Sequence, residues 1–190
     1  TCLFCPELGY MFDAGETMKH KPSKLFITHC HSDHTFHAPY TYTRNKILDI
    51  FVPEESKQLL YSYLKSAQSL NDGVESPIGV REFYKLNSVR SNDIIHLSDT
   101  MMCQVIACCH TVPCVGYAFF EKRKKLKAEY ASMTGKQVGE LRKSGVDVSE
   151  VITVPLFAFL GDTTPEVFDN NPVLKTMPYI VVECSFLEGE

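Results

Sequence analysis

The stretch Thr28-His29-Cys30-His31-Ser32-Asp33-His34 directly follows the apolar run Leu25-Phe26-Ile27. It places three histidines and one aspartate within six residues, at the end of an expected buried strand. A turn at a strand end can aim alternate side chains into one cleft, where neutral imidazoles and a carboxylate suit Zn²⁺ or a similar ion. The alternative, a polar loop with accidental histidines, explains this density poorly. The stretch therefore predicts a metal site.

The overall composition predicts one globular domain. The chain has 190 residues, of which 44% are hydrophobic and 22% charged, and this is ordinary for a domain with its own core. No apolar run approaches the roughly 20 residues needed to cross a bilayer, so we expect no membrane partner. The net charge of −4 argues against a uniformly basic protein, although a local basic patch can still contact nucleic acid.

Cysteine usage bears on the compartment. There are eight cysteines, but the chain is too long and too rich in core residues to need disulfide staples. Cys2-x-x-Cys5 has ligand spacing but lacks a second pair, and the adjacent Cys108 and Cys109 have poor geometry for a mutual bridge. We expect reduced, partly buried thiols and a cytoplasmic location, with the nucleus or an organelle as alternatives.

Apolar runs separated by turn signals predict the main elements. Strands are expected at 9–16 (with its turn), 24–28, 48–52, 83–86, 94–95, 101–109, 117–120, 155–160 and 179–183. A helix is expected from Pro53 to about Leu70. Its core face, by helical spacing, consists of Leu59, Leu60, Tyr63 and Leu64. Strands with helices between and after them indicate an α/β sandwich of mixed sheets.

Four of the expected strand ends terminate in polar residues suited to a functional site. They are Asp13, the cluster from His29 to His34, His110 and Asp162. Two metal ions about 3.5–4 Å apart need a bridging carboxylate, and Asp162 is the natural bridge. The alternative for both Asp13 and Asp162 is a turn-forming aspartate.

The remaining roles follow from the chemistry of each side chain. His29, His31 and His110 would hold one ion, and Asp33 with His34 the second. Asp33 could also orient or deprotonate the attacking water, because a carboxylate beside two cations stays ionised. Asp13 is expected outside the coordination sphere, where it fixes the tautomer of a ligand. We expect surface or loop positions for His20, His37 and His96.

The residues from 121 to 150 differ in character from the rest of the chain. Lysines and an arginine crowd residues 122–127, and Gly135, Gly139 and Gly145 interrupt the segment after this basic run. We expect a basic insertion in the single domain 1–190, helical near 135–143 and otherwise mobile and solvated.

Several segments together resemble the ribonuclease Z family of the metallo-β-lactamase superfamily. They are residues 12–16, 28–34, His110 with Gly116-Tyr117, 161–163 and 183–186. Residues 124–130, 135–137 and 141–146 look like the segment between the third and fourth motifs of short eukaryotic and cyanobacterial members. The resemblance covers Tyr10 to Glu188, most loosely between Ala38 and Ser98. It implies a metallo-β-lactamase-like αββα sandwich of mixed β-sheets.

The resemblance also implies a function, namely endonucleolytic removal of the 3′ trailer from precursor tRNA, which leaves a 3′-hydroxyl. Two Zn²⁺ ions are expected, with Mn²⁺ as the alternative, together with precursor tRNA as substrate and a homodimer as a further partner. The implied ligands are His29, His31, Asp33, His34, His110 and Asp162. A Lys-rich run is usually a solvated face, but beside a phosphodiesterase-like site RNA contact is favoured. The candidate RNA-binding residues are Lys122, Arg123, Lys124, Lys125 and Lys127.

Two other functions are compatible with the same motif. One is a thioesterase or lactonase of this superfamily, similar to glyoxalase II. The other is a non-catalytic RNA- or protein-binding module with a degraded metal site. Turnover of precursor tRNA against a thioester separates the first from a ribonuclease, and metal content separates the second.

The sequence departs from the family pattern in three places. The opening strands before Asp13 are missing, and the family's last metal-binding histidine would lie beyond Glu190. We therefore expect the chain to be incomplete at both termini. The long Gly/Pro-rich arm with which the family binds tRNA is not identified in this sequence.

Overall fold

The N-terminal strands form one mixed sheet in the computed structural model, which describes residues 1–16, 19–43, 45–75 and 83–183. The strand order is β1 (Leu3–Cys5), β2 (Tyr10–Phe12), β3 (Lys24–Phe26), β4 (Leu48–Pro53) and β5 (Tyr84–Val89). Only β1 and β2 are antiparallel, and the other neighbours are parallel. The residues that follow β2 and β3 therefore lie at one edge of the sheet.

The remaining strands form a second mixed sheet of five strands. The order is β10 (Ile180–Val182), β9 (Ser149–Leu160), β8 (Val115–Leu126), β7 (Met101–Ala107) and β6 (Ile94–His96). These neighbours are antiparallel except for the parallel pair β10 and β9. Because β9 and β10 are parallel, the residues after both strands also meet at one edge.

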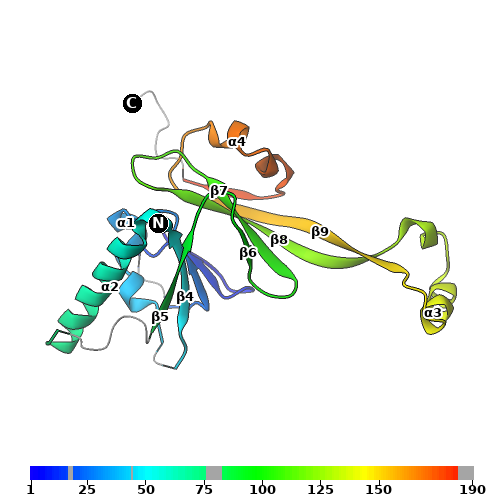
Figure 1. Ribbon diagram of the computed structural model, residues 1–190, viewed down its shortest axis with the longest axis horizontal. Helices are drawn as coiled ribbons and strands as arrows, with labels where there is room; N and C mark the ends of the chain where they lie inside the picture. Colours follow the sequence, from blue (N-terminus) through cyan, green and yellow to red (C-terminus); the bar gives the residue numbers. More distant parts are fainter. Residues whose placement is uncertain (17–18, 44, 76–82, 184–190) are drawn as a thin grey trace.

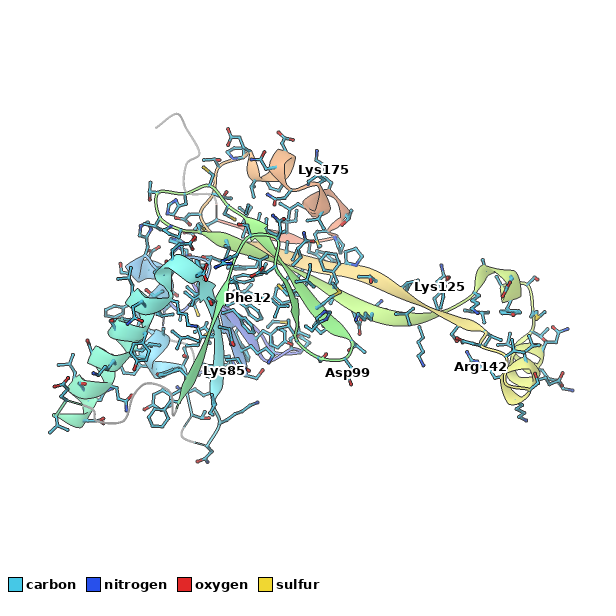
Figure 2. The ribbon with its side chains drawn as sticks, viewed as in Figure 1. Phe12, Lys85, Asp99, Lys125, Arg142 and Lys175 are labelled. Atoms are coloured by element: carbon cyan, nitrogen blue, oxygen red, sulfur yellow. The ribbon has the colours of Figure 1, made fainter. Side chains whose placement is uncertain are left out.

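Aromatic side chains fill the space between the two sheets. The ring of Phe12, labelled in Figure 2, lies 4.9 Å from that of Phe159 on the second sheet. Phe26 stacks on Phe51 with ring centroids 4.8 Å apart and meets Phe119 edge-on. Each buried ring removes about 150–250 Å² from water, so this layer holds the sheets face to face.

Helices cover the outer faces of both sheets (Figure 1). On the first sheet, α2 (Lys57–Asp72) buries Leu60 and Leu64 against β4 residues such as Ile50. On the second, α4 (Val167–Asn170) and η5 (Pro172–Thr176) pack Val167 and Leu174 onto the sheet. Three helical turns lie in the segments that connect β3, β4 and α2. They are α1 (Ser32–Thr35), η1 (Ala38–Tyr40) and η2 (Glu54–Ser56). The predicted αββα sandwich of mixed sheets is confirmed. None of the described helices is long and apolar enough to cross a membrane.

The expected core face of α2 is only half right. Leu60 and Leu64 are buried, but Leu59 is 69% exposed and Tyr63 36% exposed. The residues of each pair are four positions apart, so both pairs fit a helical row. Only the row of Leu60 and Leu64 faces the sheet.

A long two-stranded arm, residues 121–154, projects from the sandwich (Figure 1). The ends of β8 and β9 pair from Glu121↔Val154 to Leu126↔Ser149, beyond an irregularity at Phe119/Phe120. Such a bulge bends a strand and increases its twist. The arm carries η4 (Ala128–Tyr130) and α3 (Gly135–Lys143), whose first turn is closed by a Thr134–Gln137 capping box. The helix lies where predicted, whereas the paired strands on either side differ from the irregular segment that we expected.

Candidate metal centre

Five chain segments that follow strands meet at one edge of the sandwich. Asp13 follows β2, and Thr28 with the histidine cluster follows β3. His110 lies in the loop between β7 and β8. Asp162 follows β9, and Glu183 follows β10. Two hydrogen bonds fix the two sheets relative to each other here, because buried Tyr117 donates to the carbonyl of Ile27 at 2.7 Å and the Val115 amide donates to that of Thr28 at 2.9 Å.

Three histidine nitrogens converge at the first ligand cluster. Nδ1 of His31 lies 3.1 Å from Nε2 of His29 and 3.2 Å from Nε2 of His110. Tetrahedral Zn–N bonds of about 2.0–2.1 Å separate neighbouring nitrogens by about 3.3–3.4 Å. The observed separations are therefore close to those of a three-histidine zinc site.

A second cluster surrounds Nε2 of His34. This atom lies 3.1 Å from Asp33 Oδ2, and 3.6 Å from both Asp162 Oδ1 and Glu183 Oε2. Asp162 also reaches the first cluster, since its Oδ2 is 3.8 Å from His110 Nε2. One carboxylate thus lies between the two groups of ligands.

The donor atoms of this second cluster fit a cation. Among the described residues, three buried side-chain polar atoms lack a hydrogen-bond partner, and two of them are His34 Nε2 and Asp162 Oδ1. An unpaired buried acceptor costs about 1–3 kcal/mol, and three carboxylates around one imidazole repel each other. A divalent ion would bind the unpaired atoms and offset the repulsion between the carboxylates. The residues present therefore fit the metal that the motif implies.

Asp13 fixes the orientation of His34 from behind. Its side chain is fully buried, and its Oδ2 accepts a hydrogen bond from Nδ1 of His34 at 2.8 Å. With the proton on Nδ1, the lone pair of Nε2 faces the other ligands, as in carboxylate–histidine–metal arrangements. Asp13 occupies the left-handed region (φ 53°), a conformation that aspartate tolerates better than most residues.

Thr28 connects Asp13 to the first cluster. Its amide donates to Asp13 Oδ1 at 2.8 Å, and its hydroxyl to Asp13 Oδ2 at 2.9 Å. The same hydroxyl lies 3.1 Å from Nδ1 of His29 and can accept a hydrogen bond from it. This tautomer leaves Nε2 of His29 free to bind a metal. A Cβ on Gly161 would lie 2.4 Å from the Thr28 hydroxyl, so glycine is needed for this close approach.

The electrostatics keep His29 neutral. Burial, together with the neighbouring imidazoles of His34 and His110, lowers the pKa of His29 to about 3. Burial also lowers the pKa of His34, but the hydrogen bond from its ring to Asp13 and the negative charges of Asp13, Asp33 and Asp162 together outweigh this and raise the pKa overall. Burial raises the pKa of Asp13. The raised pKa of His34 keeps its Nδ1 protonated, so that Nδ1 donates to Asp13.

Comparison with known proteins shows similarity to tRNase Z proteins. The chain is 32% identical over 201 residues to the chloroplastic tRNase Z TRZ2 of Arabidopsis thaliana, covering 99% of this chain and 54% of that protein. It is 27% identical to tRNase Z TRZ1 of the same plant, covering 99% of this chain and 68% of that protein. These similarities are consistent with the ribonuclease Z family.

The proteins similar to this chain include a bacterial one. The ribonuclease Z of Marinobacter nauticus is 27% identical over 171 residues, covering 77% of this chain and 49% of its own length. The chain thus spans about half to two thirds of these relatives. No family model matches it. The metallo-beta-lactamase fold protein YhfI from Bacillus subtilis aligns over 58% of this chain and 44% of its own chain. The sequence identity is 11% and the TM-score is 0.37, so no argument is based on this weak similarity.

Sequence reasoning missed two residues of this site. Glu183 is one, although its position after the last strand is the same signal that identified Asp162. Thr28 is another, because its hydrogen bonds depend on the neighbouring strand. His37, expected at the surface or in a loop, lies in the turn between α1 and η1, where it is half-buried and donates from Nδ1 to the carbonyl of Gly15 at 3.0 Å. Residues 184–186 of the family-like segment lie outside the described residues.

The basic residues predicted to bind RNA lie on the arm, away from the ligand clusters. Figure 2 labels Lys125 on its strands and Arg142 on its terminal helix. Arg123 pairs with Glu121 at 2.6 Å, and Lys127 donates to the carbonyl of Asp147 at 2.6 Å. Within the described residues, the other three form no ion pair. These three are Lys122, Lys124 and Lys125.

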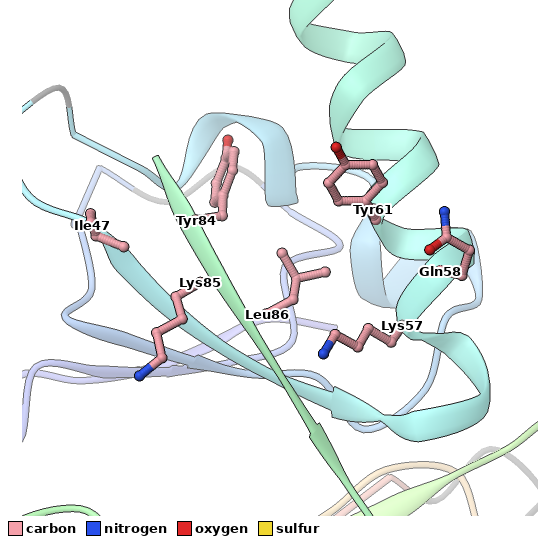
Figure 3. Close-up of a pocket in the computed structure, with 7 residues that line it drawn as sticks. All are labelled: Ile47, Lys57, Gln58, Tyr61, Tyr84, Lys85 and Leu86. Atoms are coloured by element: carbon pink, nitrogen blue, oxygen red, sulfur yellow. The ribbon is translucent and has the colours of Figure 1, made fainter. Parts of the chain in front are cut away.

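A separate pocket of about 600 Å³ lies between α2 and β5 (Figure 3). Its described lining consists of Ile47, Lys57, Gln58, Tyr61, Tyr84, Lys85 and Leu86. These residues include no histidine and no carboxylate. The pocket therefore lacks the ligands and the proton acceptor that the strand-end site provides.

Proposed function

We propose that this chain forms the catalytic part of a metal-dependent endoribonuclease that removes the 3′ trailer from precursor tRNA. The observation that carries the proposal is the pair of adjacent ligand clusters that share Asp162. The similarity of the chain to proteins named tRNase Z supports RNA as the substrate.

Two Zn²⁺ ions are the proposed cofactors, with Mn²⁺ as the alternative. The first would be held by the imidazoles of His29, His31 and His110. The second would be held by His34 and Asp33, with Glu183 near enough to contribute, while Asp162 would reach both. When bound, such a pair of ions activates water and neutralises charge on a phosphodiester.

The side chains of this site support hydrolysis in distinct ways. Asp33 is the proposed proton acceptor, because its carboxylate is 64% exposed and can meet a water molecule from solvent. Asp13 and Thr28 hold the tautomers of His34 and His29, so that no rearrangement is needed before the substrate arrives. His34 keeps its proton on Nδ1, away from the reacting phosphate.

The arm is the proposed contact for the body of the RNA. Lys122, Lys124 and Lys125 have no competing carboxylate within the described part of the chain, and successive residues of a strand point to opposite faces. Lysines on both faces of a projecting ribbon can follow the phosphates of a bound helix. Arg123 and Lys127 would join them after giving up their present partners.

We further propose a cytoplasmic location and a homodimer. The first relative is named as chloroplastic, so fractionation would distinguish the cytoplasm from a plastid. Light scattering of the full-length protein would test the dimer.

The test is cleavage of a precursor tRNA with a 3′ trailer by the full-length protein. We expect one cut after the discriminator base, with a 3′-hydroxyl on the tRNA. Asp33→Ala and Asp162→Ala should abolish cleavage, whereas Asp99→Ala, at an exposed residue labelled in Figure 2, should not. Thioester turnover without RNA cleavage would favour the glyoxalase-like alternative. A folded protein that binds precursor tRNA but holds no metal would favour the non-catalytic module.

A further inference from the structure

Two cysteines lie opposite each other at the base of the loop that carries His110. The last paired residues of β7 and β8 are Ala107 and Val115. Cys108 and Cys114 are the next residues on the two strands. Directly opposed residues of antiparallel strands have Cα atoms about 4.5–5.5 Å apart, and disulfides span Cα separations of about 4.4–6.8 Å. A bond between these cysteines therefore requires no rearrangement of the strands.

The two thiols are already in contact. A hydrogen bond with the Cys108 thiol, together with burial, raises the pKa of Cys114 well above its ordinary value. The thiol of Cys108 also lies over Gly116, 3.4 Å from where a Cβ would be. Both cysteines line a cavity of about 670 Å³ that opens beside His110. A small oxidant can reach the pair through this cavity.

The same loop is tied to Asp162. The thiol of Cys114 donates to the backbone carbonyl of Asp162 at 3.3 Å. The amide of Cys109 donates to the hydroxyl of Thr163 at 3.1 Å. The loop that carries His110 is thus hydrogen-bonded to the segment that carries Asp162.

We propose that Cys108 and Cys114 form a reversible disulfide under peroxide, and that this bond weakens metal binding at the neighbouring centre. The half-buried Cys108 reacts first: its sulfur gains one peroxide oxygen to give a sulfenic acid, and one water leaves. The sulfur of Cys114 then attacks that of Cys108. The S–S bond forms, the S–O bond breaks, and the oxygen leaves as a second water with the Cys114 proton. Two thiols are oxidised, and one peroxide is reduced.

The effect on the metal centre follows from the lost thiol proton. Once Cys114 is in a disulfide, it cannot donate to the Asp162 carbonyl, and the support of the shared carboxylate is removed. Loss of an outer hydrogen bond at a metal site weakens metal binding about 10–100-fold. This second half of the inference rests on the proposed function, whereas the disulfide itself does not.

The test exposes the reduced full-length protein to hydrogen peroxide, followed by peptide mass spectrometry without reductant. We expect one bond, between Cys108 and Cys114, that dithiothreitol reverses. It should be absent from Cys108→Ser and unchanged in Cys109→Ser, which removes the exposed neighbouring thiol. A bond through Cys109, or a Cys108 that is oxidised without ever pairing with Cys114, would overturn the assignment.

Zinc affinity, measured by competition with a chelator, tests the coupling. Oxidation should weaken zinc binding at least about tenfold in the wild type and in Cys109→Ser, but not in Cys108→Ser. An unchanged affinity in the disulfide-bonded protein would overturn the coupling. A reduced protein that binds no zinc would instead contradict the proposed function, and the peptide masses would still decide on the disulfide.

Discussion

Nδ1 of His34 donates a hydrogen bond to Oδ2 of Asp13 across 2.8 Å, between two side chains that are both fully buried. Asp13 directly follows β2, and His34 lies on α1 after the neighbouring parallel strand β3. Since a metal ligand must offer a lone pair, the position of this one proton decides whether His34 can bind metal. The contact makes Asp13 a positioning residue of the site.

Asp13→Ala should weaken both zinc binding and the fold. The change leaves the Thr28 amide, the Thr28 hydroxyl and the His34 ring without their buried acceptor. Loss of one partner of a buried ion pair costs about 3–5 kcal/mol, and loss of an outer-sphere partner about 10–100-fold in metal affinity. Chelator competition and denaturant unfolding would measure the two effects. Asp13→Asn should lose less in both, and a wild-type zinc affinity in Asp13→Ala would show that Asp13 does not position His34.

Gly161→Ala should disturb the same network from the other sheet. The new Cβ would lie 2.4 Å from the Thr28 hydroxyl, which is already held by Asp13. Forcing extra atoms into a packed site costs about 1–3 kcal/mol, and zinc affinity should fall with it. The control is Gly139→Ala in α3, where a Cβ meets no atom within 4 Å. A helix gains up to about 1 kcal/mol from this exchange. Equal effects on zinc affinity in the two variants would contradict the prediction.

Removal of His110 should empty the first ligand cluster selectively. His110→Ala takes one of three converging nitrogens, so we expect the full-length protein to hold fewer zinc equivalents in dialysis followed by metal analysis. His96→Ala, at an exposed histidine on β6, should leave the metal content unchanged. A metal content that is insensitive to His110 would remove this residue from the site.

Neutralising the unpaired lysines of the arm should weaken RNA binding without stopping the chemistry. We expect the Lys122, Lys124 and Lys125 to Ala variant to bind precursor tRNA less tightly. The salt dependence of binding should also become shallower, by about one unit of slope for each phosphate that is no longer neutralised. In the control variant, Lys57, Lys65 and Lys85 are changed to Ala, which removes the same amount of charge from the body of the protein. If both triple variants lose affinity equally, the arm has no special role.

The edge of the sheet where function lies could be predicted from the sequence, because each ligand follows an apolar run. Asp13, His110 and Asp162 stand at the ends of strands that local patterns reveal. The helix face was harder to predict. Leu59 and Leu60 begin two adjacent rows of equal spacing, and only the packing of α2 on β4 decides which row is buried.

The features that sequence reasoning missed depend on contacts between distant residues. Strand pairing between Leu126 and Ser149 builds the arm, and no local pattern in a lysine-rich segment reveals it. The role of Thr28 likewise arises from its hydrogen bonds to Asp13, which follows the neighbouring strand β2. Such contacts exist only once the sheet register is set.

The most direct test of the account is an anomalous difference map, at the zinc absorption edge, from crystals of the full-length protein grown with zinc. We predict one peak among the ring nitrogens of His29, His31 and His110, and a second beside Nε2 of His34, with Asp162 between them. A map with no peak at these histidines, or with zinc held by cysteines instead, would contradict the account.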